Sequence, residues 1–193
     1  MKSFFTTFIL TLLFFVATFA VSFAQINWTK HPEPVLTHGS AGAWDSLYIQ
    51  HSAVVFDGTK YHMYYSAQSA ITGHFSIGHA TSDEGISWEK DALNNPVLEK
   101  GPSGAWDADY VVNASVLYDG STFHMWYTGA RPTNINIRIG YATSPDGSIW
   151  QKYNDPATTS TLYADSDPVL IPGSSGRWDD NHVEVPFVMM EGN

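Results

Sequence analysis

Three aspartates in this sequence stand in a repeated motif and are the first candidates for acid–base chemistry. The motif is G-x-x-G-x-W-D, and its copies occupy residues 39–45, 101–107 and 173–179. The aspartates that close these copies are Asp45, Asp107 and Asp179. An active site needs a given catalytic carboxylate once, whereas this one returns in every copy. We therefore expect a structural role, in which each carboxylate accepts hydrogen bonds from backbone N–H groups of its own loop.

A carboxylate without counterparts in the other copies is a better candidate. When the copies are aligned on W-D, the sixth residue after the tryptophan is Gln50, Val112 or Glu184. Glu184 lies in the otherwise apolar stretch 183–188. Burial of a carboxylate raises its pKa, and a general acid that works at neutral pH needs a raised pKa. Glu184 is therefore expected to be either a general acid or a buried glutamate satisfied by the backbone of a neighbouring repeat.

Other polar residues are candidates because of their positions in the repeats. Those near the start of the stretches that follow the motif are Asp109, Tyr110, Asp180 and His182. Arg131 belongs to a later loop of the second copy. The alternative for each of them is an ordinary solvated surface residue. The motif tryptophans are candidates for stacking on sugar rings, but their repetition favours a packing role.

The segments that must position these residues have the two-residue period of β-strands. Residues 48–56 and 60–67 are rich in β-branched and aromatic types and are joined by Asp57-Gly58, which predicts a hairpin. Side chains of two kinds alternate along the second arm, and the alternation returns at 123–128. Third strands are predicted at 75–81 and 137–143, with short fourth strands near Trp88 and Trp150.

Repetition of four short antiparallel strands predicts an all-β fold, a β-propeller of four-stranded blades. The repeat units are about 28–88, 88–150 and 150–193, which amounts to about two and a half blades, with Trp28 opening the first unit. A β-sandwich made of the same hairpins is the alternative architecture. The turn at 81–88 fits the Asp-box pattern [ST]-x-D-x-G-x-x-W, which we interpret as a device for packing its tryptophan.

The two ends of the sequence differ from the repeats. Residues 1–24 begin with Lys2, continue as an apolar run and close on Ser22-Phe23-Ala24, which predicts a secretory signal peptide. A retained membrane anchor is the alternative. The last residues, 189–193, reach only the turn at which the other copies begin their second strand. We therefore expect 25–193 to be a partial propeller domain, with further blades supplied by the rest of a longer protein.

The repeated pattern resembles that of the five-bladed propellers of the arabinanase, levansucrase and invertase superfamily, which includes glycoside hydrolase families 43, 32, 68 and 130. The resemblance covers 25–193 and rests on Pro-Val-Leu, G-x-x-G-x-W-D, Asp-Gly, His-Met-Trp-Tyr and I-G-x-A-T-S. It implies a five-bladed ring when complete and activity on carbohydrate. For family 43 it implies that a Glu-x-Pro glutamate of the third blade is the acid, and 184–186 read Glu-Val-Pro.

The same resemblance implies aspartates on the first two inner strands, where this sequence has His51 and Asn113. Glycoside hydrolysis needs two carboxylates roughly 5 to 10 Å apart. The second carboxylate would then be Asp109 or Asp180, or would come from further blades. The residues expected to bind substrate are Gln50, His51, Tyr110, Asn113, Arg131, Asp180 and His182.

These observations predict an exported glycoside hydrolase that acts on plant or microbial polysaccharide or oligosaccharide, with Glu184 as general acid. A catalytically silent propeller that binds glycans or proteins is the alternative. The Asp-box raises a third reading, a sialidase. Sialidases need an arginine cluster for the substrate carboxylate, and the arginines of this chain are Arg131, Arg138 and Arg177, so this reading ranks last.

The composition of the chain limits the classes of partner and cofactor that it is expected to bind. The formal net charge is −10 and there is no cysteine. An acidic surface argues against nucleic acid and anionic membranes as partners. The family resemblance implies carbohydrate as the partner. An exported chain without disulfides depends on its core, which suits a bacterial secreted or periplasmic protein. The sequence has no P-loop and its histidines are scattered, so no cofactor is expected. The superfamily implies a channel Ca²⁺, but no ligand set for it is visible.

Overall fold

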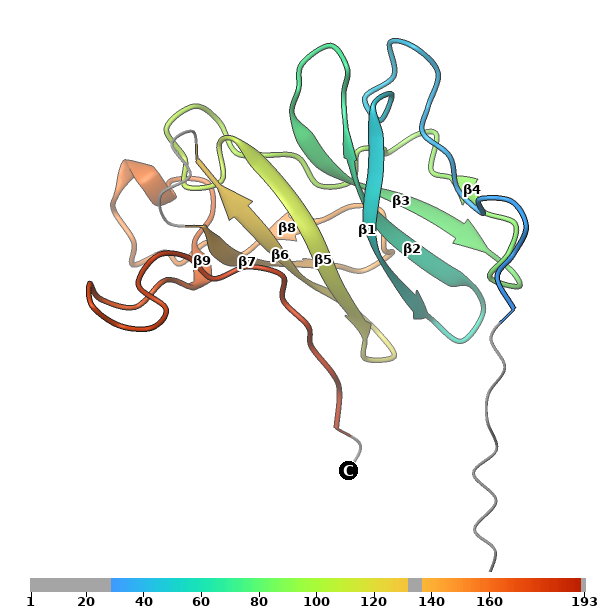
Figure 1. Ribbon diagram of the computed structural model, residues 1–193. Helices are drawn as coiled ribbons and strands as arrows, with labels where there is room; N and C mark the ends of the chain where they lie inside the picture. The colour runs from blue at the N-terminus through green and yellow to red at the C-terminus, as the bar shows by residue number, and fades with distance from the viewer. Residues whose placement is uncertain (1–28, 132–136, 192–193) are drawn as a thin grey trace, which may run out of the picture. The chain divides into compact units, whose positions relative to one another are not determined.

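Two antiparallel sheets form from the two full copies of the repeat (Figure 1). In the first sheet the strands lie in chain order: β1 (Tyr48–Phe56), β2 (Tyr61–Gln68), β3 (Phe75–Ser82) and β4 (Glu89–Lys90). The second sheet repeats that order with β5 (Tyr110–Tyr118), β6 (Phe123–Ala130), β7 (Arg138–Ser144) and β8 (Gln151–Lys152). The predicted all-β fold of four-stranded antiparallel blades is therefore confirmed.

The computed structural model describes residues 29–131 and 137–191. The chain divides into two compact units, Met1–Pro32 and Glu33–Asn193, and every strand lies in the second. In the first unit, 29–32 contain no helix or strand. Three features of the sequence lie outside the described residues. They are the predicted signal peptide at 1–24, Trp28, and Gly192 in the last turn. No helix in the described part is long and apolar enough to cross a membrane.

Aspartate side chains fix the turns that join the first two strands of each sheet. Asp57 Oδ1 accepts hydrogen bonds from the backbone N–H groups of Thr59 and Lys60, both at 2.7 Å. Asp119 Oδ1 repeats this with Ser121 at 2.9 Å and Thr122 at 2.8 Å. These bonds set the register in which Phe56 faces Tyr61 and Tyr118 faces Phe123. The predicted hairpins are therefore held by local side-chain contacts.

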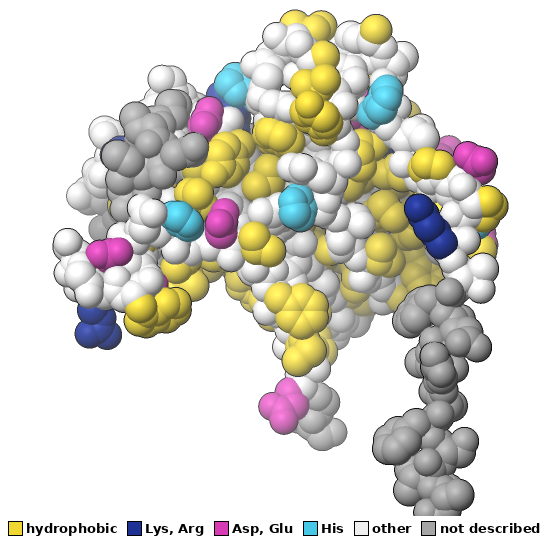
Figure 2. All heavy atoms as spheres, viewed as in Figure 1, with side chains coloured by type: hydrophobic (Ala, Val, Ile, Leu, Met, Phe, Trp, Pro, Cys, Tyr) yellow, Lys and Arg dark blue, Asp and Glu magenta, His cyan; other side chains and the backbone are white. Residues whose placement is uncertain are grey.

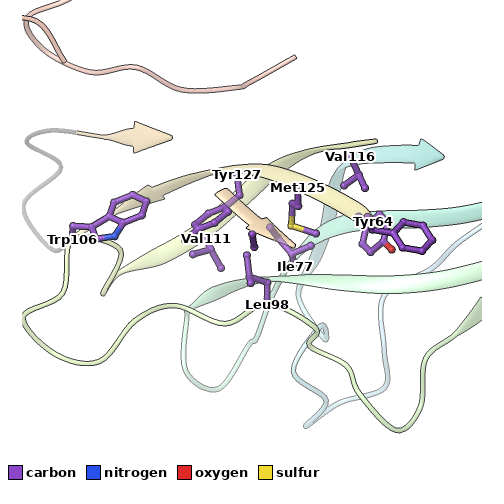
Figure 3. Close-up of a cluster of buried hydrophobic side chains, with 10 residues drawn as sticks. Tyr64, Ile77, Leu98, Trp106, Val111, Val116, Met125 and Tyr127 are labelled. Carbon is purple, nitrogen blue, oxygen red and sulfur yellow. The ribbon is translucent and has the colours of Figure 1, made fainter. Parts of the chain in front are cut away.

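The main core lies where the first sheet meets the second (Figure 3). Its buried members are Tyr64, Ile77, Leu98, Trp106, Val111, Val116, Phe123, Met125, Tyr127 and Ala142. Tyr64 comes from β2 and also donates a hydrogen bond of 2.9 Å to the carbonyl of Gly147, in the turn before β8. Strand β5 lies next to β1, β2 and β3. Burial of aromatic and aliphatic side chains from both sheets stabilises their contact.

The repeated Pro-Val-Leu segments add pairing to the third strands that the sequence analysis did not anticipate. β9 (Pro168–Leu170) pairs with β7, and Leu98 forms a bridge with Ile77 of β3. The predicted inner strand of a third blade, at 183–188, is not a strand: no described residue pairs with it in a ladder. This segment nevertheless contacts the second sheet, because Val188 N–H donates to Ser115 Oγ at 3.0 Å.

The first two aspartates of G-x-x-G-x-W-D, Asp45 and Asp107, have a structural role, but not the predicted one. Asp45 pairs with Lys90 of β4, and Asp107 pairs with Lys152 of β8. The carboxylates therefore bind a lysine from the last strand of the blade rather than backbone N–H groups of their own loop. The first glycine of the motif makes room for them, since a Cβ at Gly101 would clash with Asp107 Oδ1. The second, Gly104, has a φ of +94° that disfavours other residues.

The Asp-box turns hold their tryptophans as predicted. Trp88 Nε1 donates to the carbonyl of Gly85 at 3.1 Å, and Trp150 Nε1 donates to that of Gly147 at 3.0 Å. The second turn is stabilised by Asp146, whose Oδ1 accepts from Ser148 and Ile149 N–H groups. These turns serve packing at the outer edge of each sheet.

Candidate active site

A single residue in each copy turns the inner segment of the repeat out of regular strand geometry. His51, Asn113 and Val185 have positive φ angles of 47°, 56° and 55°. All three are the seventh residue after the motif tryptophan. In β1 and β5 the ladder is interrupted at the same place, between Gln50 and Ser52 and between Val112 and Ser115. Such bulges redirect side chains and are common next to active sites.

Val185 is the most unusual of the three residues. A positive φ costs a β-branched residue more than it costs asparagine, because Cβ crowds the backbone. Strain of this kind persists only where the surrounding structure imposes it, and it concentrates at functional sites. Val185 follows Glu184 directly. The strained residue thus lies next to the predicted general acid.

Hydroxyl groups from the preceding blade hold these turned residues in place. Ser66 Oγ of β2 accepts the backbone N–H of Asn113 at 2.9 Å. Thr128 Oγ1 of β6 accepts the backbone N–H of Val185, also at 2.9 Å. Ser66 and Thr128 are buried and occupy equivalent positions in the two sheets. The same hydrogen bond therefore links the second strand of each sheet to the inner segment of the next repeat.

The three inner segments line a cavity of about 490 Å³. His51 and Asn113 contribute to its wall, together with Ser52, Ser115, Val185 and Phe187. The Oδ1 atom of Asn113 is buried and has no hydrogen-bond partner in the described part of the chain. A buried acceptor without a partner is rare and costs stability, so Oδ1 would have to become accessible before a ligand hydroxyl could bind it. The cavity thus combines apolar walls with a few polar groups, as small-molecule sites do.

A group of ionisable residues surrounds Glu184. His182 Nε2 lies 3.7 Å from Glu184 Oε1. Burial raises the pKa of Tyr110, and the negative charges of Glu184 and Asp109 raise it further. The structure therefore brings Glu184, Asp109, Tyr110 and His182 into one electrostatic environment. Figure 2 shows histidine and acidic side chains side by side over β7 and the C-terminal segment, among hydrophobic side chains.

The burial expected for Glu184 is wrong for the described residues. Its side chain is 44% exposed and that of His182 is 38% exposed. The reason is that 183–188 pair with no described strand, so one side of the segment remains open to solvent. The expected apolar surroundings are therefore missing, although the neighbouring charges are present.

Other predicted site residues are not drawn into this group by any contact among the described residues. Asp180 Oδ2 accepts the backbone N–H of Gly176 at 2.6 Å and so stabilises its own motif loop. Arg131 and Gln50 are exposed. Within 29–131 and 137–191, no three His, Cys, Asp or Glu side chains converge as a metal site would require.

Sequence reasoning missed the hydroxyls that orient the inner segments. The signal was present, because Ser66 and Thr128 follow the aromatic runs of β2 and β6 at the same repeat position. Lys90 and Lys152 were missed as well, although each follows the motif aspartate by 45 residues. A polar residue that recurs at the same position of each repeat indicates that its side chain has the same partner in each repeat.

Comparison with solved structures defines the class to which this fold belongs. The chain is similar to a family 117 glycoside hydrolase from Zobellia galactanivorans, with a TM-score of 0.58 and 13% identity over 79% of this chain and 48% of that one. A second glycoside hydrolase gives a TM-score of 0.56 and 21% identity over 78% and 41% of the two chains. The described sheets thus share the fold of these glycoside hydrolases, in agreement with the sequence resemblance.

Curated relatives point in the same direction. A β-1,2-mannobiose phosphorylase of Thermoanaerobacter sp. is 25% identical over 133 residues, which are 62% of this chain and 42% of that protein. An uncharacterised protein of Mycobacterium tuberculosis is 30% identical over 128 residues, with the same shares. The chain thus spans about two fifths of the length of these relatives. No protein-family model matches it.

Proposed function

We propose that this chain belongs to a carbohydrate-active enzyme that cleaves glycosidic bonds, with Glu184 as the general acid. The observation that carries the proposal is the strained Val185, which lines the cavity and directly follows Glu184 in the chain. Glu184 itself is not one of the described residues that line this cavity. Glu184 would protonate the oxygen of the leaving sugar as the bond from that oxygen to the anomeric carbon breaks. His182, at 3.7 Å, would orient its carboxyl group.

The other polar groups fit substrate binding. Asn113 and His51 line the same cavity, where they would contact the sugar. The Tyr110 hydroxyl is protonated at neutral pH and can donate a hydrogen bond, and the shift raises its pKa further from that range. Asp109, whose charge acts on Tyr110 together with that of Glu184, is our candidate for the second catalytic carboxylate. Export after cleavage at Ala24, and a bacterial secreted or periplasmic location, remain predictions.

Phosphorolysis is a second candidate, favoured by His51 and Asn113 at positions where two carboxylates would serve hydrolysis. In phosphorolysis inorganic phosphate attacks the anomeric carbon, so the protein needs an acid but no carboxylate base. The glycosidic bond breaks, its oxygen takes the proton of Glu184, and the product is a sugar 1-phosphate. The curated relative from Thermoanaerobacter is named as a phosphorylase.

The test is sugar release from β-1,2-mannobiose, arabinan, xylan and fructan, with and without inorganic phosphate. The proposal predicts release by the protein and a loss of at least about 100-fold for Glu184→Gln, a typical contribution of general acid catalysis. Release of sugar 1-phosphate that depends on phosphate would assign phosphorolysis. Equal activity of the protein and Glu184→Gln would refute the role of Glu184. Binding without turnover would favour the silent glycan-binding propeller.

A further inference from the structure

The motif tryptophans of the two sheets have different surroundings. In the second sheet Trp106 is 1% exposed. Its Nε1 donates to Ser166 Oγ at 3.0 Å, and its backbone N–H donates to the carbonyl of Leu162 at 3.1 Å. Both donors of Trp106 are thus satisfied by one later segment of the chain, which also covers the ring.

No corresponding segment covers Trp44 in the first sheet. Motif copies two and three are 72 residues apart, whereas copies one and two are 62 apart, and the longer connection contains the 3₁₀ turn η1 (Thr161–Tyr163). Trp44 is only half-buried, and none of the described residues accepts a hydrogen bond from its indole or backbone N–H. Trp44 keeps the ring stacking that Trp106 also has, because it stacks on Tyr65 with ring centroids 5.9 Å apart. Among residues 29–131 and 137–191, the shorter connection therefore provides no acceptor for the two donors of Trp44.

A cavity of about 490 Å³ lies at this place. Trp44, Ile71 and Pro96 supply apolar surface to its wall, and Thr72, His74 and Lys100 supply polar groups. Ile71 is 74% exposed. The volume falls in the range of small-molecule sites. This cavity shares no lining residue with the one between the inner segments.

We infer that the cavity at Trp44 is a second carbohydrate subsite, which holds a neutral sugar unit. Sugars present an apolar C–H face and a rim of hydroxyls, which match an aromatic ring with free N–H donors beside it. The lining carries both Glu99 and Lys100, so it does not select an anion by charge. That the ligand is a carbohydrate rests on the proposed function. The binding place is different, because this cavity is separate from the one lined by the inner segments.

The test is calorimetric titration of the protein with β-1,2-mannotetraose and β-1,2-mannobiose. Trp44→Phe keeps a ring against Tyr65 but removes the indole N–H, and Ser76→Leu narrows the cavity without altering Trp44. Each is expected to weaken tetraose binding about tenfold, which is the size of one or two lost hydrogen-bond and stacking contacts. Trp106→Phe is the matched control, because it removes an indole N–H that the protein itself satisfies, and its tetraose affinity should not change.

The outcomes separate this inference from the proposed function. Unchanged tetraose affinity in both Trp44→Phe and Ser76→Leu overturns the subsite, even if Glu184→Gln abolishes turnover. Weakened binding in both variants supports the subsite, even if the protein cleaves none of the sugars offered. Equal weakening by Trp106→Phe would also overturn it, because the loss would then follow from the fold and not from the cavity.

Discussion

At the scale of single residues, this chain places charged groups where burial makes their pairing costly to break. Asp107 is completely buried against Lys152, and its Oδ1 has no further partner in the described part of the chain. His62 Nδ1 and His79 Nε2 lie 2.9 Å apart inside the first sheet. Neither arrangement touches the candidate active site. Both therefore report on the stability of the blades rather than on chemistry.

The Asp107–Lys152 pair should be sensitive to loss of its lysine. Lys152→Met leaves a buried carboxylate without a countercharge, so we expect the free energy of unfolding to fall by about 3 kcal/mol. Urea denaturation at neutral pH measures it. Adding Asp107→Asn should restore part of the loss, because the uncompensated charge disappears. Lys90→Met is the matched comparison and should cost less, since the Lys90 side chain is 29% exposed against 16% for Lys152.

The histidine pair predicts a loss of stability in mild acid. Burial, followed by the neighbouring His62, lowers the pKa of His79 from 6.5 to about 4. Between these values the unfolded chain binds a proton that the folded chain does not, so the free energy of unfolding falls as the pH is lowered. The loss reaches about 3 kcal/mol near pH 4. In His79→Gln the slope between pH 6.5 and 4 should flatten, and an unchanged slope would contradict the assignment.

At the scale of elements, the second and third inner segments are each supported by a hydroxyl of the blade before them. Thr128 is fully buried and accepts the N–H of Val185, next to Glu184. Thr128→Val keeps the shape of the side chain but leaves that N–H unpaired. We expect kcat to fall about tenfold with little change in KM, because the acid loses its position. Ser66→Ala is the control in the first sheet, and a fall of similar size there would contradict a specific link to Glu184.

Strands could be predicted closely from the sequence, because alternation and turn residues are local signals. The first strand was expected at 48–56 and is Tyr48–Phe56, and the third was expected at 75–81 and is Phe75–Ser82. The partners of the motif aspartates could not be predicted in the same way, because they depend on how distant strands meet. The positive φ of Val185 was also beyond sequence reasoning, since valine rarely adopts it.

At the scale of the whole molecule, the candidate site is assembled from three consecutive repeats. β1 and β5 supply His51 and Asn113 to the cavity, and the segment after the third motif supplies Val185, next to Glu184. The repeat-based alignment predicted the candidate residues from the sequence, and their roles stay predictions. It did not predict the exposure of Glu184, because exposure depends on what lies against the open side of 183–188. Activity is therefore the decisive property to measure.

The most direct test of the account compares leaving groups. A general acid is needed when the leaving group is a poor one, such as the alkoxide of a sugar hydroxyl. It is dispensable when the leaving group is 2,4-dinitrophenolate. With the glycosyl unit found in the substrate screen, we predict that Glu184→Gln loses at least about 100-fold in kcat/KM on the disaccharide. The same variant should retain near-normal kcat/KM on the dinitrophenyl glycoside. Equal losses on both substrates would contradict the assignment of Glu184 as the general acid.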